Sequence, residues 1–376
     1  MKYFFVAGEA SGDLHTSRVM NALKRLDPSA QFAYMGGSKM REEGGNSVVI
    51  SEHLAFMGFL DVMKNISKID KAGKQVQRAL LSFNPDVVIC TDYASFCFRY
   101  VLPFVRKNLP HTRIAYFIPP KVWAWKKGRI HQLKRDTDLI LSIFPFELDF
   151  FKQNGIEHIT YVGNPTKEEV DEHLDKHKCI NKPPYIALLP GSRTSEVHQN
   201  LPTMLNVAQH FSNFKIKIAG KRSIPIEIYE QYLSKDIELV WEDSFSVIHG
   251  ARVALVTSGT ATLETALLGT PQVVCYAHRL KRLGNFIFNK LFSVPYISLV
   301  NLIGGREIVK ELYAGLFTEE NILRAMAPLT QESPQRQAMM QSYQDIRKLL
   351  ETQELSSVRS AECLLNLAQS KTPNDQ

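Results

Sequence analysis

The sequence predicts an α/β protein with two doubly wound, parallel-sheet domains of the Rossmann type. Short β-branched, apolar runs alternate with longer amphipathic stretches, which is the pattern of βαβ units. Several runs are apolar throughout, as strands covered by helices on both faces must be. A length of 376 residues is enough for two domains of ordinary size.

The expected strands follow one another at regular intervals. In the first half they are 2–8, 31–37, 86–92, 113–119, 138–144 and 159–165. In the second half they are 185–192, 214–220, 237–243, 253–259 and 271–277. The segment between the halves is polar and ends in two prolines, which predicts a short polar helix and a linker. The expected division is a domain over 1–165, a linker over 166–184, a domain over 185–345 and a helical tail over 346–376.

The amino-acid composition limits the classes of protein to which the chain can belong. Hydrophobic residues make up 44% and charged residues 22% of the chain, as in soluble globular proteins. The five cysteines form no CxxC pair, so we expect neither a disulfide framework nor a metal site, and a reducing cytoplasm fits best. We expect no signal peptide and no membrane span. The net charge of +7 favours an anionic partner: a nucleotide, a nucleic acid or an acidic membrane.

In open parallel sheets, ligands bind beyond the carboxyl ends of the strands. The strand expected at 185–192 runs into Gly191, Ser192 and Arg193. Glycine lets the backbone approach a ligand, serine can cap the next helix, and arginine offers a forked donor to phosphate. The stretch predicts a diphosphate site; the alternative is an ordinary turn with a surface arginine.

A second candidate stretch follows the strand at 253–259. Small residues leave room there, and a helix start offers N–H groups to a second face of a diphosphate. The residues are Ser258, Gly259, Thr260, Ala261 and Thr262. Glu264, in the first helical turns, can accept hydrogen bonds from two ribose hydroxyls. The alternative is an N-cap followed by a glutamate that favours the helix dipole.

A third stretch, SLVNLIGGRE, places Asn301 and Arg306 around a Gly-Gly turn. Both side chains suit a polar ligand. The alternative is a loop that only joins two elements.

The loop after the first strand reads GEASGDLH. It lacks the lysine of a P-loop and the third glycine of a dinucleotide fingerprint, so it matches neither nucleotide motif. Further along, Trp123 and Trp125 with basic neighbours either line a cleft or act as an aromatic anchor between the domains.

The stretch 56–78 combines apolar residues with lysines and an arginine. It is either a surface for an anionic membrane or a helix packed in the core with a solvated face. The residues expected to contact a membrane are Phe56, Met57, Phe59, Leu60 and Met63.

Five motifs together carry a resemblance that covers essentially the whole chain. GEASGD, VWAWKKGR, LLPGSR, SGTATLE and SLVNLIGGRE occur in this order. The set resembles the lipid-A-disaccharide synthase family. The resemblance implies the GT-B architecture, in which two Rossmann-like domains face a central cleft, with the acceptor on the first domain and the UDP-sugar on the second.

The resemblance also implies an activity. It is transfer of 2,3-diacylglucosamine from its UDP conjugate onto 2,3-diacylglucosamine 1-phosphate, which gives a β-1′,6-linked disaccharide 1-phosphate and UDP. An α-linked donor and a β-linked product imply one inverting displacement. The implied setting is the inner face of the cytoplasmic membrane of a Gram-negative bacterium, with an anionic lipid surface as partner and no cofactor. A homodimer is left open, and no D-x-D motif predicts a metal.

Residue roles follow from the match. Arg193, Glu264 and Asn301 stand at family positions important for activity. Asp92 matches the first acid of a D-x-P-D-F-N loop and is the first candidate base, whereas Ser95 stands where the family has the second acid. Asp13 is the second candidate base.

On the acceptor side, the resemblance leaves the opening loop facing the acceptor. Its helix start either receives the 1-phosphate of the acceptor or gives the sugar close access to the backbone, with Asp13 nearby. The expected contacts are Gly8, Ser11 and Gly12.

Two rival functions belong to other classes. A UDP-N-acetylglucosamine 2-epimerase would share the two-domain architecture without a glycosyl acceptor. A basic nucleic-acid-binding protein would fit the charge, but no recognised nucleic-acid motif is present and the basic residues are scattered. The missing dinucleotide fingerprint disfavours a dehydrogenase.

Overall fold

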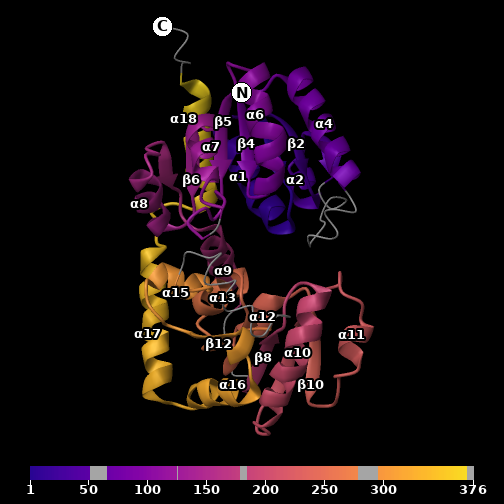
Figure 1. The fold of residues 1–376 in the computed structure, drawn as a ribbon, viewed down its shortest axis with the longest axis vertical. Helices are drawn as coiled ribbons and strands as arrows, with labels where there is room; N and C mark the ends of the chain where they lie inside the picture. Colours follow the sequence, from indigo (N-terminus) through magenta and orange to yellow (C-terminus); the bar gives the residue numbers. More distant parts are fainter. Residues whose placement is uncertain (51–65, 125, 178–183, 278–294, 371–376) are drawn as a thin grey trace. The chain divides into compact units, whose positions relative to one another are not determined.

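The structure is a computed structural model, and it describes residues 1–50, 66–124, 126–177, 184–277 and 295–370. The described chain forms two units. The first unit comprises Met1–Pro165 together with the C-terminal segment from Thr352, and the second comprises Thr166–Glu351. The C-terminal helix therefore belongs to the first unit, although the chain passes through the second unit before reaching it (Figure 1).

The first unit is built on a parallel sheet of seven strands in the order β3-β2-β1-β4-β5-β6-β7. Its strands are β1 (Lys2–Ala7), β2 (Gln31–Gly36), β3 (Asn46–Ile50), β4 (Val87–Thr91), β5 (Arg113–Phe117), β6 (Leu139–Ser142) and β7 (Ile159–Tyr161). Its helices are α1 (Ala10–Leu26), α2 (Ser38–Glu42), α4 (Ile66–Phe83), α5 (Ala94–Phe96), α6 (Leu102–Asn108), α7 (Arg129–Asp136), α8 (Pro145–Gln153) and α18 (Ser356–Gln369). A π-helical turn, Cys97–Val101, joins α5 to α6.

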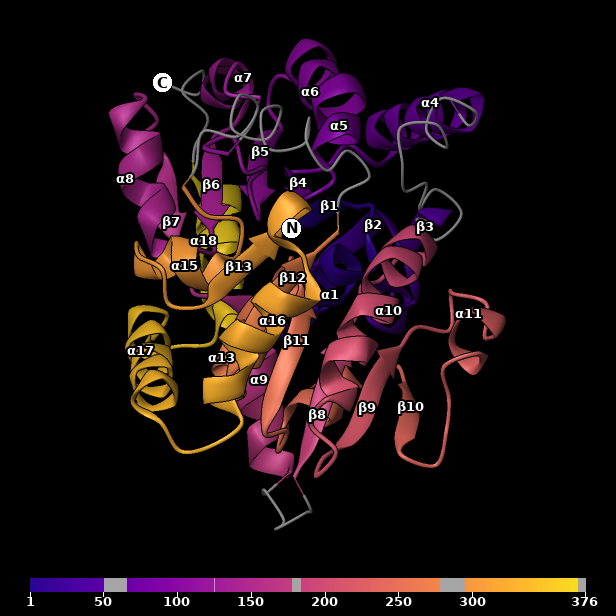
Figure 2. The ribbon, with the colours of Figure 1, turned by 60° about the horizontal axis from the view of Figure 1, so that its bottom comes forward.

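The second unit has a parallel sheet of six strands in the order β10-β9-β8-β11-β12-β13, which lie side by side in Figure 2. Its strands are β8 (Tyr185–Leu189), β9 (Lys215–Gly220), β10 (Ile237–Trp241), β11 (Val253–Thr257), β12 (Gln272–Tyr276) and β13 (Lys310–Tyr313). Its helices are α9 (Pro165–Lys176), α10 (Thr194–Gln209), α11 (Glu227–Glu230), α12 (Ser244–Ile248), α13 (Thr260–Leu267), α15 (Leu299–Gly304), α16 (Glu319–Met326) and α17 (Pro334–Leu349).

Both sheets show why their strands are apolar. Val6, Cys90 and Leu255 are each fully buried because helices cover both faces of each sheet. In the first unit α4, α6 and α7 pack on one face, and α1 and α18 pack against each other on the opposite face. In the second unit α10 and α16 contact each other, and α13 contacts α15 and α17. The α/β class with two doubly wound parallel sheets is confirmed.

All the expected strands are present, and two further strands were missed. β3 and β13 lie at sheet edges and are only partly buried, so they lack the apolar run that identifies a central strand. The segment expected as a linker, 166–184, begins with α9, which belongs to the second unit. The expected tail, 346–376, is divided between the end of α17 and α18.

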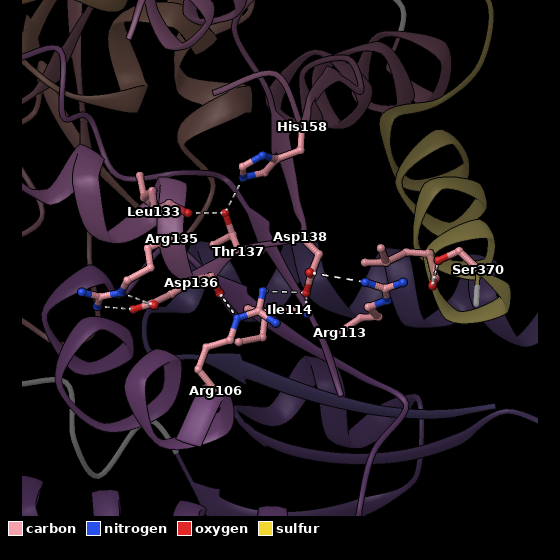
Figure 3. Close-up of polar contacts among 11 residues, drawn as sticks. Arg106, Arg113, Ile114, Leu133, Arg135, Asp136, Thr137, Asp138, His158 and Ser370 are labelled. Atoms are coloured by element: carbon pink, nitrogen blue, oxygen red, sulfur yellow. Dashed lines mark hydrogen bonds and ion pairs between the residues drawn. The ribbon is translucent and has the colours of Figure 1, made fainter. Parts of the chain in front are cut away.

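A polar cluster joins the amino ends of the strands β5 and β6, at the edge of the first sheet opposite the carboxyl ends (Figure 3). The Asp138 carboxylate accepts hydrogen bonds at 2.7 Å from the Arg106 guanidinium and from the Ile114 N–H. A second guanidinium, that of Arg113, lies 3.6 Å from the same carboxylate. All three charged side chains are mostly buried, so each charge depends on its partners.

We predict that Asp138→Asn destabilises the first unit by about 2 kcal/mol, because it removes the negative charge that two mostly buried guanidinium groups share. For a unit of this size, the melting temperature should fall by about 4–8 °C. Thermal unfolding followed by circular dichroism measures the change.

The control is Glu320→Gln, which removes an exposed partner of Arg324 on α16. It should leave the melting temperature unchanged, since exposed ion pairs contribute little. Equal effects of the two variants would contradict the structural role of Asp138.

Candidate functional site

The strand order of the second sheet reverses between β8 and β11, the position at which ligands bind in such sheets. The buried side chain of Asn200 joins the strand ends at this point. Its amide nitrogen donates to the Pro190 carbonyl at 2.9 Å and lies 3.0 Å from the Thr257 hydroxyl oxygen. Its amide oxygen accepts from the N–H of Ala277, after β12, at 2.8 Å. Sequence analysis did not single out Asn200, because a mid-helix asparagine carries no local motif.

The Gly191–Arg193 stretch is closely associated with Glu196 in the first turn of α10. Gly191 has a φ of 125°, and a Cβ on it would stand 2.6 Å from the Glu196 carboxylate, so no side chain fits. That carboxylate accepts from the Ser192 N–H at 3.0 Å and lies 3.4 Å from the Arg193 guanidinium. The Arg193 side chain is 52% exposed, which leaves most of its surface open to solvent.

The start of α13 lies beside this stretch, because β8 and β11 are neighbours. Gly259 adopts a φ of 149° and has no atom within 4 Å of its missing Cβ. Thr260 is exposed, and Ala261 is half-buried. Thr262 is fully buried and its hydroxyl donates to the Gly259 carbonyl at 2.8 Å, so that hydroxyl stabilises the helix start. The Ser258 hydroxyl donates to the Ile297 carbonyl at 3.3 Å.

Glu264 lies further along α13 and is electrostatically unusual. Burial, followed by the negative charge of Glu169 on α9, raises its pKa to about 7, and Lys221 opposes this rise. A carboxylate of this kind changes charge near neutral pH. It gains most from a ligand that donates hydrogen bonds to its ionised form.

Asn301 forms its hydrogen bonds within the protein. It is fully buried, and its amide nitrogen donates to the Val309 carbonyl at 2.9 Å and to the Glu311 carboxylate at 2.8 Å. Its amide oxygen accepts from the N–H groups of Ile308 and Val309. These bonds use both donors and both lone pairs of the amide. Asn301 therefore fixes α15 against the start of β13, and its contact with a nucleotide sugar stays a prediction.

Arg306 has a similar structural contact. Its guanidinium donates to the hydroxyl of Ser342 on α17 at 2.9 Å. The residue follows α15 and precedes β13, so it lies toward the amino edge of the sheet, opposite Gly191. The structure thus does not bring Arg306 together with Arg193 at the strand reversal.

An open hollow lies at the carboxyl ends of β9 and β10. It was not expected from the sequence, because its residues come from separate segments. They are Arg222, Ile224, Pro225, Ile226, Glu227 and Trp241. The hollow combines an aromatic ring with apolar and charged groups on the same edge as Gly191 and Gly259.

The first sheet reverses its strand order between β1 and β4. The hydroxyl of Thr16 on α1 donates to that of Thr91 at 2.9 Å, which ties the opening loop to the end of β4. Gly8 leaves room for Tyr93, because a Cβ on Gly8 would stand 2.1 Å from the tyrosine ring. Gly12 is buried against β1 and β4, whereas Ser11 is exposed. Of the three expected acceptor contacts, Ser11 alone presents a side chain to solvent.

Asp92 follows β4 at this reversal in an unusual backbone conformation. Asp92 and Tyr93 have φ values of 49° and 30°, in the left-handed region that side chains other than glycine rarely adopt. The Asp92 N–H donates to the Phe117 carbonyl at 3.2 Å, and the Tyr116 hydroxyl donates to the Asp92 carbonyl at 2.6 Å. Strain of this kind persists where surrounding bonds enforce it and is typical of functional sites.

The environment of Asp92 makes its carboxylate a stronger base. Burial raises its pKa, and the positive charges of Lys121 and His15 oppose this rise. A carboxylate with a raised pKa accepts a proton more readily than an ordinary surface aspartate.

Asp13, the second candidate base, has another role in the structure. Its carboxylate accepts from the N–H groups of Gly37 at 2.7 Å, Lys39 at 2.9 Å and Met40 at 3.2 Å. It therefore binds the start of α2 from outside that helix, as an N-cap does. Both its oxygens are occupied, so the geometry favours Asp92 as the base.

The loop after β5 is anchored through Trp123. Its indole N–H donates at 2.9 Å to Glu147, a fully buried carboxylate that also accepts from the Ser142 hydroxyl at 2.5 Å. Burial raises the pKa of Glu147 to about 7, although these bonds and Lys121 oppose the shift. Trp123 thus anchors its loop to α8 within the first unit, which tests neither the ligand site nor the interdomain anchor. Trp125 lies outside the described residues.

The residues expected to contact membrane, Phe56, Met57, Phe59, Leu60 and Met63, also lie outside the described residues. The described part of that stretch begins α4, which buries Val76 and Leu80 in the core and exposes Lys71, Lys74 and Arg78. No helix in the described ranges has both the length and the hydropathy of a membrane span.

Comparison with known proteins gives the family. The family model described as lipid-A-disaccharide synthetase matches residues 3–366. A lipid-A-disaccharide synthase from Solibacter usitatus is 30% identical over 359 residues, covering 93% of each chain. The alignment therefore extends over most of both proteins.

Solved structures share the fold at low identity. The glycosyltransferase of kitacinnamycin superimposes with a TM-score of 0.65 at 13% identity, covering 98% of this chain and 99% of the other. A UDP-GlcNAc 2-epimerase from Methanocaldococcus jannaschii, in complex with UDP-GlcNAc and UDP, gives 0.64 at 12% identity, covering 97% and 100%. This likeness shows the GT-B architecture, and the sequence match decides between enzyme classes: the chain belongs to the lipid-A-disaccharide synthetase family.

Proposed function

We propose that the chain is an inverting hexosyltransferase that moves 2,3-diacylglucosamine from UDP-2,3-diacylglucosamine to 2,3-diacylglucosamine 1-phosphate. The family match over residues 3–366 carries the proposal. In support, the Gly191 and Gly259 loops meet at the strand reversal of the second sheet, and Asp92 lies at that of the first.

The reaction is one displacement. The 6-hydroxyl of the acceptor attacks the anomeric carbon of the donor, the bond from that carbon to the UDP oxygen breaks, and the hydroxyl proton passes to Asp92. The leaving UDP carries the negative charge, which the Arg193 guanidinium and the N–H groups at the start of α13 stabilise. Glu264 accepts hydrogen bonds from the ribose hydroxyls of UDP. The aromatic face of Trp241 provides a stacking surface for the uracil ring.

The second proposal concerns location. We infer that the protein works at an anionic membrane surface, because both substrates carry acyl chains and the exposed face of α4 is basic. The apolar residues that the sequence predicts to contact a membrane precede α4 in the chain.

The transfer assay tests the function together with the base. Wild-type protein, UDP-2,3-diacylglucosamine and the acceptor should yield the disaccharide 1-phosphate and UDP. Asp92→Asn should reduce turnover by a factor of about 10²–10⁴ and preserve UDP affinity, since it removes a base and leaves the second unit unchanged. Wild-type turnover should fall as pH drops through the raised pKa of Asp92, above the ordinary aspartate range.

Near-normal turnover by Asp92→Asn would show that another group is the base. Conversion of UDP-N-acetylglucosamine to its 2-epimer without an acceptor would favour the epimerase instead.

The donor site has a pH signature. Ribose hydroxyls donate to the ionised form of Glu264, whose pKa is about 7, so uridine binding should strengthen as pH rises through 7 and weaken up to tenfold per pH unit below it. Glu264→Gln should abolish this dependence. Isothermal titration calorimetry with uridine between pH 5.5 and 8.5 measures this pH dependence. Uridine is used because, unlike UDP, it has no phosphate groups that change protonation in this range.

Arg193→Ala is the matched comparison. It should weaken UDP binding about tenfold to a hundredfold and leave uridine binding unchanged, because it removes a phosphate contact only. If uridine affinity depends on pH in the same way in wild type and in Glu264→Gln, Glu264 does not bind the ribose.

Membrane binding is tested by flotation with vesicles containing phosphatidylglycerol. Replacing Phe56, Met57, Phe59 and Leu60 by serine should abolish flotation and leave UDP affinity unchanged. Persistent flotation would exclude these residues as the membrane contact.

A further inference from the structure

An unusual distribution of charge surrounds the candidate base. Between Asp92 and Asp136 the chain contains ten basic residues and no aspartate or glutamate. The ten are Arg99, Arg106, Lys107, Arg113, Lys121, Lys126, Lys127, Arg129, Lys134 and Arg135. Such an excess of positive charge in one continuous stretch favours an anionic ligand.

The arginines of this stretch differ in their partners. Four form ion pairs with aspartates: Arg99 with Asp70, Arg106 and Arg113 with Asp138, and Arg135 with Asp136. The fifth, Arg129, donates instead to the hydroxyl of Ser95 at 3.2 Å.

The guanidinium of Arg129 also lies 5.0 Å from the centroid of the Phe98 ring. A hydroxyl and an aromatic ring hold the guanidinium in place without neutralising its charge. Within the described part of the chain, Arg129 has no carboxylate partner.

The position of Arg129 connects it to the reacting centre. Ser95, its partner, is three residues beyond Asp92, in the short helix α5 that follows β4. Arg129 begins α7, and its N–H donates to the Lys126 carbonyl at 3.0 Å in a turn that also exposes Lys127. Trp123 anchors the same loop to Glu147. The cations and Asp92 therefore share the carboxyl edge of β4 and β5.

Lys126 adds a second positive charge. Its pKa is lowered, first by burial and then by the charge of Arg129. Its backbone is left-handed, with a φ of 53°. Two cations held this close are stabilised when an anion with several oxygens lies between them.

The start of α1 is less suitable for an anion. Glu9 and Asp13 bring two carboxylates to that helix start, and a phosphate placed there would be repelled. The opening loop therefore suits the neutral part of the acceptor sugar.

We propose that the basic loop, defined as Lys121, Lys126, Lys127 and Arg129, binds a phosphomonoester, and that this group is the 1-phosphate of the acceptor. The assignment rests on the proposed function. In glucosamine 1-phosphate, the carbon that carries the phosphate and the carbon that carries the CH₂OH group flank the ring oxygen. A phosphate on Arg129 thus brings the 6-hydroxyl toward Asp92, three residues from the Ser95 contact. Arg129 is a substrate-binding residue that selects acceptors with a 1-phosphate.

The test compares Arg129→Gln with Lys107→Gln. Lys107 belongs to the same basic stretch, but it lies at the end of α6 that leads to the amino edge of the sheet, so its replacement removes equal charge elsewhere. Arg129→Gln should raise the KM for the acceptor about tenfold to a hundredfold and leave UDP affinity unchanged, whereas Lys107→Gln should change neither. Arg129→Lys should raise the KM for the acceptor less than Arg129→Gln does, because lysine keeps the positive charge but lacks the bidentate donor geometry of the guanidinium.

A soluble probe makes the test independent of acyl chains. Binding of glucosamine 1-phosphate and of glucosamine is followed by NMR titration of the full chain. Arg129→Gln should lose the preference for the phosphorylated sugar, with circular dichroism showing an intact fold.

Three results would overturn the inference. They are equal acceptor KM values for Arg129→Gln and wild type, equal losses in Arg129→Gln and Lys107→Gln, and reduced binding to phosphatidylglycerol vesicles with unchanged binding of the soluble probe. The last result would show that the basic loop binds the phosphates of lipid headgroups instead of the acceptor. Absence of transfer by wild type would instead overturn the proposed function, and the soluble probe would still decide the phosphate site.

Discussion

The arrangement of this protein depends on one constraint, the alignment of all strands within each sheet. Because the strands are parallel, every carboxyl end opens at one edge, and the order reverses beside the first strand of each unit. At that reversal two loops leave in opposite directions and expose backbone groups between them. Gly8 and Asp92 lie there in the first unit, and Gly191 and Gly259 in the second. The opposite edge, with Asp138 and its two arginines, holds the strands together through charged groups that are mostly buried.

The sequence was sufficient for the fold class, and its site residues stay predictions. Central strands such as β1 and β8 are apolar along their whole length and are recognisable without any partner. β3 and β13 are edge strands whose burial is incomplete, so their residues do not show a strand pattern. Two of the glycine motifs, around Gly191 and Gly259, lie at carboxyl ends of strands as expected, whereas Arg306 lies toward the amino edge.

The partners of individual side chains were not predictable in this way. Asn301 bonds to Glu311, and Asp13 bonds to α2, through contacts that no spacing in the sequence specifies. Both had the residue type and the neighbourhood of a ligand contact, and both are saturated by the protein itself. Ser95 shows the converse: its departure from the family pattern becomes interpretable only when Arg129 is found beside it. Sequence motifs therefore identify which loops matter, whereas the distribution of hydrogen bonds decides which atoms remain for a substrate.

The path of the chain has a consequence for its synthesis. The first unit is completed by α18, which packs against α1, and the Ser356 hydroxyl donates to the Gly163 carbonyl at 3.2 Å. During translation the sheet of this unit emerges early, but α18, which packs on one of its faces, is made only after the whole second unit. The part of that face under α18 must therefore stay uncovered, or be shielded by a chaperone, until the ribosome has passed the second unit. The second unit, Thr166–Glu351, is continuous and has no such delay.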